Sequence, residues 1–209
     1  MIKTLITAAA LVLGGSAAYA NTITLAAVDG NLYQQTVQSP CIFSNSSCQQ
    51  PAGFTSTALD NGGAVSGYDA SVSYLGSQIT SIIGAGNSLL LGLDINQASG
   101  QPAQTLTSFT MAVNGNVVDT YTGSANNVPA GNNGNGYADF LLSNFSSFAA
   151  GDTVTFHFVF NNANDGTENV FLIGGPATSS VPEPTNSMLI GSGLAALGLI
   201  RRYWKKKTV

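Results

Sequence analysis

The chain has 209 residues and a formal net charge of −4, but its charges are divided unevenly along its length. The stretch 21–180, called the body below, contains nine of the ten acidic residues and none of the six lysines and arginines, so its own charge is 0 − 9 = −9. Without cations the body cannot neutralise phosphates, which excludes nucleic-acid binding, and its fold must rest on apolar burial and backbone hydrogen bonds.

The first 20 residues have the pattern of a secretory signal peptide. Lys3 is followed by an apolar run from Leu5 to Leu13 and then by small residues that end in Ala18-Tyr19-Ala20. These match a charged n-region, an h-region and an A-x-A cleavage site, and the apolar run is too short for a membrane span. We therefore predict a signal peptide at 1–20 and a mature chain that begins at Asn21.

Cys41 and Cys48 are the only cysteines of the chain. A pair this close in an exported protein is expected to form one disulfide, which in the chain-entropy model contributes roughly 2.5 kcal/mol. A metal site is not favoured, because no second cysteine pair or nearby histidine completes the ligands.

Apolar residues of the body repeat with period two, which is the pattern of strands with one buried side. The clearest examples are NSLLLGLDIN at 87–96 and GDTVTFHFVF at 151–160, and further strands are expected at 22–28, 32–38, 64–75, 137–142 and 169–173. Asn114-Gly115 lies between two apolar runs and predicts a β-hairpin turn. No helix of convincing length is expected before the C-terminal apolar run.

About nine short strands separated by Gly, Asn and Ser clusters predict an all-β fold for an ectodomain at 21–175. We expect an antiparallel β-sandwich of jelly-roll-like type. A closed barrel fits the same periodicity, so the pattern alone does not choose between the two architectures.

The body offers little for catalysis. His157 is the sole histidine, no G-x-S-x-G motif is present, and lysine bases and arginine clamps are absent from 21–180. Paired carboxylates could still serve a glycosidase, because the sequence does not show which acids meet. We predict a protein that is not an enzyme and needs no cofactor.

One polar loop has the composition of a calcium site. Residues Asn162, Asn164, Asp165 and Glu168 crowd a segment between two expected strands, and their oxygens are the ligand type that calcium prefers. The spacing departs from the EF-hand pattern, and a simple Asn/Asp/Gly turn explains the same residues. A calcium-assisted carbohydrate-binding module, with tyrosines as sugar platforms, is therefore the alternative function.

The end of the chain differs from everything before it. An extended linker at 176–186 contains Pro182-Glu183-Pro184, and mostly apolar residues at 187–204 predict a transmembrane helix of about 27 Å. A basic stop-transfer cluster then marks the cytoplasmic end and the basic tail at 205–209; it comprises Arg201, Arg202, Lys205, Lys206 and Lys207.

This three-part ending resembles the PEP-CTERM sorting signal of exported proteins from Gram-negative bacteria. The matching parts are the Pro182-Glu183-Pro184 motif, the apolar run and the basic cluster, and they cover about the last 29 residues. The resemblance implies recognition by an exosortase in the inner membrane, which processes the tail near the motif. It also implies delivery from the periplasmic side of the membrane to the cell surface or to the exopolysaccharide matrix of a biofilm. A permanent single-pass anchor is the alternative interpretation of the same residues.

Overall fold

The computed structural model describes residues 20–28, 31–44, 48–57, 67–96, 104–123, 127–128, 134–162 and 168–176. The chain divides into two units, Met1–Pro176 and Ala177–Val209, and all the described residues belong to the first. Within these ranges no helix has the length and apolar character needed to cross a bilayer. The predicted transmembrane helix at 187–204, the sorting motif and most of the signal peptide lie outside the described residues.

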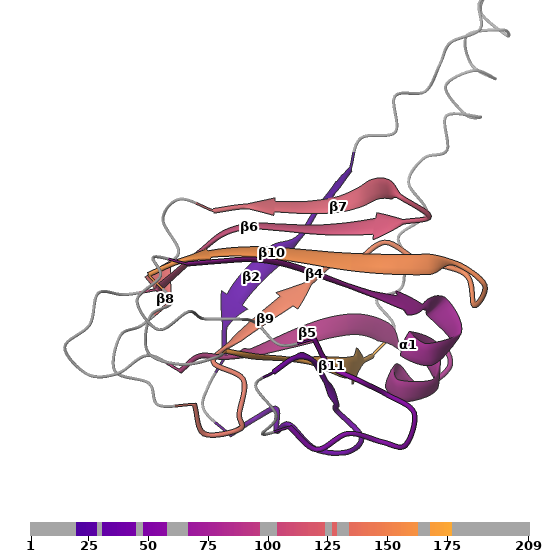
Figure 1. Ribbon diagram of the computed structural model, residues 1–209, viewed down its shortest axis with the longest axis horizontal. Coiled ribbons are helices and arrows are strands. Elements are labelled where there is room, and N and C mark those ends of the chain that lie inside the picture. The colour runs from indigo at the N-terminus through magenta and orange to yellow at the C-terminus, as the bar shows by residue number, and fades with distance from the viewer. Residues whose placement is uncertain are drawn as a thin grey trace, which may run out of the picture. The chain divides into compact units, whose positions relative to one another are not determined.

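The strands form two sheets in a β-sandwich-like arrangement, seen edge-on as two layers in Figure 1. Sheet A has the order β1 (Asn21–Thr22), β7 (Asn116–Thr122), β6 (Gln104–Val113), β10 (Thr153–Asn161) and β4 (Gly67–Leu75), with β8 (Asn127–Val128) also on β6. Sheet B has the order β2 (Thr24–Ala27), β9 (Phe140–Ser143), β5 (Ser88–Asp94), β11 (Asn169–Gly175) and β3 (Cys41–Phe43). Every described strand pair is antiparallel except β1 with β7, and the structure is mostly β, as predicted.

The chain changes sheet at nearly every step. From β3 to β11, successive strands alternate between sheet B and sheet A, except that β6, β7 and β8 all lie in sheet A. The β6–β7 hairpin turns at the predicted dipeptide, where Asn114 has φ 51° and Gly115 has φ 81°. Positive φ at both central positions is what a two-residue hairpin turn requires, so this prediction is confirmed.

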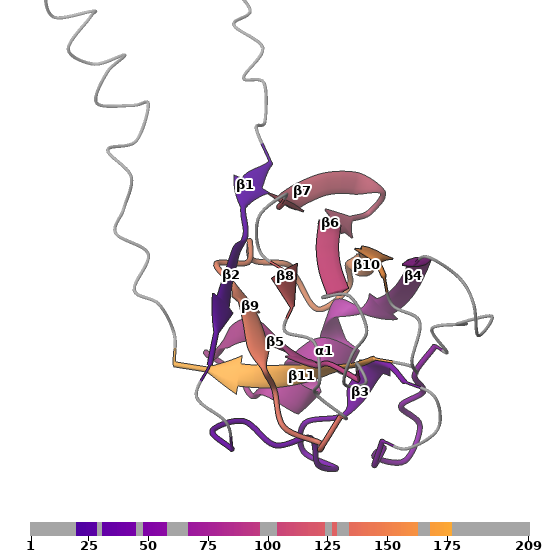
Figure 2. The same ribbon diagram turned by 90° about the vertical axis from the view of Figure 1, so that its left-hand side faces the viewer.

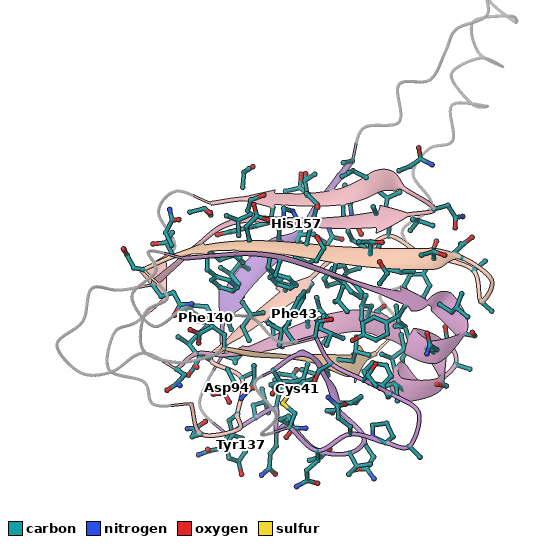
Figure 3. All side chains as sticks on the ribbon, viewed as in Figure 1. Cys41, Phe43, Asp94, Tyr137, Phe140 and His157 are labelled. Carbon is teal, nitrogen blue, oxygen red and sulfur yellow. A yellow bond between two sulfur atoms is a disulfide. The ribbon has the colours of Figure 1, made fainter. Side chains whose placement is uncertain are left out.

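The core lies between the sheets and is rich in phenylalanine. Alternate residues of β10 point inward, and Phe158 meets Phe43 of sheet B edge-on at a centroid distance of 5.2 Å. Phe109 of β6 lies 4.7 Å from the same ring, and Figure 3 shows Phe43 and Phe140 between the layers. Each fully buried phenylalanine contributes about 1.5–3 kcal/mol of hydrophobic stabilisation. Such burial holds the two sheets together in a body that has no lysine or arginine for ion pairs.

Sheet B is apolar on its outer face as well. A second buried cluster there contains Cys41, Ala138, Phe171 and Ile173, with Leu90 packed against it. The predicted disulfide between Cys41 and Cys48 is formed, with Cα atoms 6.0 Å apart. A strand covered on both faces must be apolar at successive positions, which explains the run of leucines in β5.

Helix α1 (Gly76–Ile83) corrects the expectation that no helix would precede the C-terminal run. Its buried residues Ile79 and Ile83 are one turn apart, and Gln78 Oε1 accepts a hydrogen bond from the Leu75 amide at the helix start. Gly76 lies so close to the Ala149 carbonyl that a Cβ would be 2.1 Å from its oxygen. Packing therefore sets this short helix, whose β-branched sequence has little helical propensity of its own.

The expected strand at 32–38 is wrong. This segment makes only isolated bridges, Gln34 with Tyr137 and Thr36 with Ser39, and Leu32 is 65% exposed. Turns replace the strand: Val37 is exposed as well, and Tyr33 packs against the outer cluster of sheet B without a partner strand to extend the pairing.

The first strands join the two sheets at one edge (Figure 2). β1 pairs with β7 of sheet A, β2 pairs with β9 of sheet B, and Ile23 between them is only 2% exposed. Asn21 and Asn144 hold this segment reciprocally: Asn21 Nδ2 donates to the Asn144 carbonyl at 2.6 Å, and Asn144 Nδ2 donates to the Thr22 carbonyl at 2.8 Å.

Candidate functional site

Three carboxylates gather at one end of the sandwich, where β5 ends and β11 begins. Asp94, Asp139 and Glu168, called the carboxylate cluster below, act on one another because the charges of Asp94 and Asp139 both raise the pKa of Glu168. Asp94 and Glu168 are fully buried, and so is Gln104 at the start of β6. Burial of ionisable groups without cationic partners is costly, so this cluster is the candidate site.

Glu168 is the most perturbed member of the carboxylate cluster. It lies in phase with Val170 and Leu172, which point into the core between the sheets. Its Oε2 accepts a hydrogen bond of 2.5 Å from the Asn96 amide, whereas its Oε1 has no hydrogen-bond partner among the described residues. Burial, followed by the nearby acids, raises the pKa of Glu168 to about 8, so at neutral pH this carboxyl is largely protonated.

Gln104 approaches Glu168 from the opposite sheet. Its side-chain amide is near enough to lower the pKa of Glu168. However, within the described ranges neither Oε1 nor Nε2 of Gln104 has a partner with the geometry of a hydrogen bond. By this criterion no hydrogen bond joins the two side chains. The buried oxygens Gln104 Oε1 and Glu168 Oε1 can therefore accept a hydrogen bond from a proton held between them or bind a cation.

Asp94 is held on the outer side of sheet B, below the lower layer in Figure 3. The amides of Asn135 and Gly136 donate to its two carboxylate oxygens at 3.1 Å and 2.9 Å. These bonds only partly offset burial, which raises the pKa of Asp94. The φ of +81° at Gly136 lets the loop turn its amide onto the carboxylate.

Asp139 completes the carboxylate cluster at the entry to β9. Its amide donates to the Leu93 carbonyl at 2.8 Å, and its Oδ2 accepts from the Ile95 amide at 2.8 Å. The successive amides of Ile95 and Asn96 thus bind different carboxylates, which fixes Asp139 and Glu168 on either side of the end of β5.

Chemically, the carboxylate cluster can hold a proton, and it offers oxygens of the kind that calcium binds. Among the described residues, no three His, Cys, Asp or Glu side chains are placed to hold a metal ion as they stand. The cluster has no histidine or cysteine, so its oxygens favour a hard cation over a transition metal.

The residues of the predicted calcium loop are only partly described. Asn162 follows β10 in a left-handed conformation with φ 61°, and Glu168 is buried in the carboxylate cluster. Asn164 and Asp165 lie outside the described residues, as do Pro182, Glu183, Pro184 and the five basic residues of the tail.

Other predicted features are now placed on the sandwich. His157 stands on the outer face of sheet A, where its Nε2 lies 2.5 Å from Asp69 Oδ1. Tyr74 and Tyr121 are 6% and 7% exposed, so neither serves as a surface platform for a sugar ring. The Tyr74 hydroxyl donates to the Thr55 carbonyl at 2.8 Å instead.

Comparison of the chain with protein-family models, with curated proteins and with solved structures finds no significant match. Sequence reasoning found Glu168 but missed Asp94, Asp139 and Gln104. Asp94 gave one signal, an acid at the end of an otherwise apolar strand, whereas Gln104 gave none.

Proposed function

We propose that this protein is an exported, non-catalytic structural or adhesive component of the cell surface or of an exopolysaccharide matrix, as in a biofilm. One observation carries the proposal: a body without lysine or arginine is followed by a Pro-Glu-Pro motif, an apolar run and five basic residues. That order and spacing fit the PEP-CTERM sorting signal.

The limits of the sandwich support this division of the chain. β1 begins at Asn21, the predicted first residue of the mature protein, and Ile23 is buried in the core. β11 ends at Gly175, which is also the predicted end of the ectodomain. Removing a leader before Asn21 or a tail beyond Pro176 would therefore leave all the described strands intact.

The topology that we propose is a jelly roll. The support is the strand order: β7-β6-β10-β4 in one sheet faces β9-β5-β11-β3 in the other, and the chain alternates between them. Jelly rolls include lectin domains, but a fold alone does not assign a ligand. In this proposal residues 187–204 span the inner membrane until an exosortase processes the tail.

The decisive experiment is the intact mass of the native protein from each cell fraction. We expect a surface or matrix species that begins at Asn21 and lacks Tyr203 and Lys207, because both ends are removed. A Glu183→Ala variant should accumulate in the inner membrane, whereas the neighbouring Asn186→Ala variant serves as the matched control. A mature protein that retains Lys207, or normal sorting of Glu183→Ala, would contradict the proposal.

A second candidate function is calcium-assisted carbohydrate binding. The observation that favours it is a pair of buried oxygens, Glu168 Oε1 and Gln104 Oε1, which have no hydrogen-bond partner in the part of the chain that the structure describes. They lie beside the charges of Asp94 and Asp139. A calcium ion would replace the proton of Glu168, so its binding should release a proton and tighten as pH rises toward 8.

Calorimetry tests this candidate in two buffers of different ionisation enthalpy. We expect calcium to bind with a heat that depends on the buffer at pH 7, and Glu168→Gln to weaken that binding. A glycan array with calcium and with chelator then measures sugar recognition. An absence of calcium heat in metal-free protein would eliminate this function and leave the structural role intact.

A further inference from the structure

A second buried acid, Asp119 on β7, also has only neutral partners. It is fully buried, and its oxygens accept hydrogen bonds from the Ser146 amide at 2.9 Å and 3.1 Å and from the Ser146 hydroxyl at 2.5 Å. Burial raises the pKa of Asp119, and the nearby side chains of Ser146 and Asn21 only partly offset it. The body has no lysine or arginine to neutralise this charge.

Removal of the predicted signal peptide would convert the backbone nitrogen of Asn21 into a free amine. In the parallel pairing of β1 with β7, Asn21 lies directly opposite Asp119. Neighbouring strands are about 4.8 Å apart, and paired residues direct their side chains to the same face. The amide of Asn21 therefore lies on the strand next to Asp119, at the position paired with it.

Asn21 is held in this position by contacts that do not involve any earlier residue. Its side chain and that of Asn144 exchange hydrogen bonds with the two backbone segments, and the Ile23 amide donates to the Thr120 carbonyl at 2.8 Å. Because Ile23 is also buried, the first residues of the predicted mature chain stay paired with β7 after a leader is removed.

We propose that cleavage of the Ala20–Asn21 bond creates an α-ammonium group that forms an ion pair with Asp119, so that export processing supplies the cation that the body lacks. The inference rests on the proposed function, which includes removal of the signal peptide after Ala20. A signal peptidase would hydrolyse the bond with water: the hydroxyl goes to the Ala20 carbonyl carbon and a proton to the Asn21 nitrogen. The new amine, with a pKa of about 8, takes a further proton from solvent at neutral pH.

No other titratable group on the surrounding described elements competes for this charge. β1, β6 and the segment 144–148, which pack around Asp119, contain no Asp, Glu, His, Lys or Arg. The sole histidine, His157, lies on the outer face of sheet A beside Asp69. The stabilising effect of the ion pair should therefore follow the titration of one amine and one acid.

The test compares three preparations of residues 21–176: a free Asn21 amine, an Nα-acetylated Asn21, and a form extended by Ala20. At pH 6.5 we expect the unfolding equilibrium constant in urea to be about tenfold lower with the free amine than with the acetyl group, because an ion pair that lowers the pKa of the acid by one unit has that effect. The extended form should lie between them, and the difference should vanish above pH 9.

Two variants and one spectroscopic measurement complete the test. The amine-dependent difference should disappear in Asp119→Asn and persist in Asp69→Asn, which removes one acid elsewhere in the same sheet. If Asp119→Asn does not fold, NMR titration of the wild type decides: the Asn21 amine should titrate above its usual value of about 8. Equal stability of the free and acetylated forms, with an unshifted amine, would refute the ion pair.

The exported protein tests the processing step separately. A mature N-terminus other than Asn21, found by intact mass, would refute the processing step and with it the predicted leader. A mature protein that does begin at Asn21 but shows no amine-dependent stability would refute the ion pair alone, and the proposed function would stand.

Discussion

Replacing Glu168 with glutamine should stabilise the protein at neutral and alkaline pH. The pKa of this carboxyl is about 8 in the fold against an ordinary value of 4.5. A group whose pKa is raised by folding stabilises the folded state below its unfolded pKa, and that contribution is lost as pH rises through its folded pKa. Wild-type stability should therefore fall between pH 4.5 and 8, and glutamine, which is always neutral, should remove this loss.

The magnitude follows from the two pKa values. The difference corresponds to about 5 kcal/mol above pH 8, at about 1.4 kcal/mol for each pKa unit, and to about 3 kcal/mol at pH 7. Glutamine can also keep the local bonds, because its oxygen accepts from the Asn96 amide and its amide can donate to Gln104. The expected gain is on the order of 3 kcal/mol at pH 7 and close to zero at pH 4.

Urea unfolding followed by far-UV circular dichroism at pH 4 to 9 measures this effect in residues 21–176. Asp152→Asn is the matched control, because hydrogen bonds from the Ala149 amide and the Asn114 side chain lower the pKa of this exposed acid. Its contribution to stability is present above its unfolded pKa and lost as pH falls through its folded pKa, so the Asp152→Asn difference should be flat from pH 5 to 8.

A stability difference between wild type and Glu168→Gln that does not change with pH would contradict a raised pKa of Glu168. So would a glutamine variant that is less stable than wild type at pH 8 in the absence of metal. Each titration is run with chelator and with calcium. A wild type that becomes more stable than the variant only when calcium is added would identify the carboxylate cluster as a cation site.

Further predictions concern the scaffold. Replacing both cysteines of the Cys41–Cys48 disulfide with serine should lower the free energy of unfolding by about 2–3 kcal/mol, measured in urea without reductant; no loss would mean that packing alone holds this loop. Gly92→Ala should lower the free energy of unfolding by about 1–3 kcal/mol, because the added Cβ would lie 2.7 Å from the Phe171 ring. Gly151→Ala is the control, because the space around Gly151 is open. Gly115→Ala should destabilise by about 1 kcal/mol through its φ of +81°, with no steric clash; a neutral result would show that the hairpin turn can relax.

Local sequence patterns were sufficient to predict individual strands and one hairpin turn. The alternation in β5 and β10 and the Asn114-Gly115 dipeptide depend on neighbours within ten residues, so the sequence displays them directly. Helix α1 was missed because its packing on distant segments outweighs its weak propensity. The segment 32–38 has strand-like residues but no partner strand, and only the tertiary structure reveals that.

The candidate site was harder to predict because it is assembled by sheet register. Gln104 and Glu168 belong to opposite sheets and are 168 − 104 = 64 positions apart in the chain. Asp94 and Asn169 become neighbours only because β5 and β11 pair in one particular register. A single sequence does not encode such long-range pairing in any local pattern, whereas the buried acid itself could be noticed from its apolar neighbours.

The place of β11 in sheet B determines how the sandwich would respond to mechanical force. β11 is the last described strand before Pro176, and it is paired on both sides, with β5 and with β3. Tension applied along the chain at its C-terminal side would have to shear both sets of backbone hydrogen bonds together, because an interior strand cannot peel away one bond at a time. A domain pulled from that end should therefore resist extension far better than one pulled from the short edge strands β1 and β2.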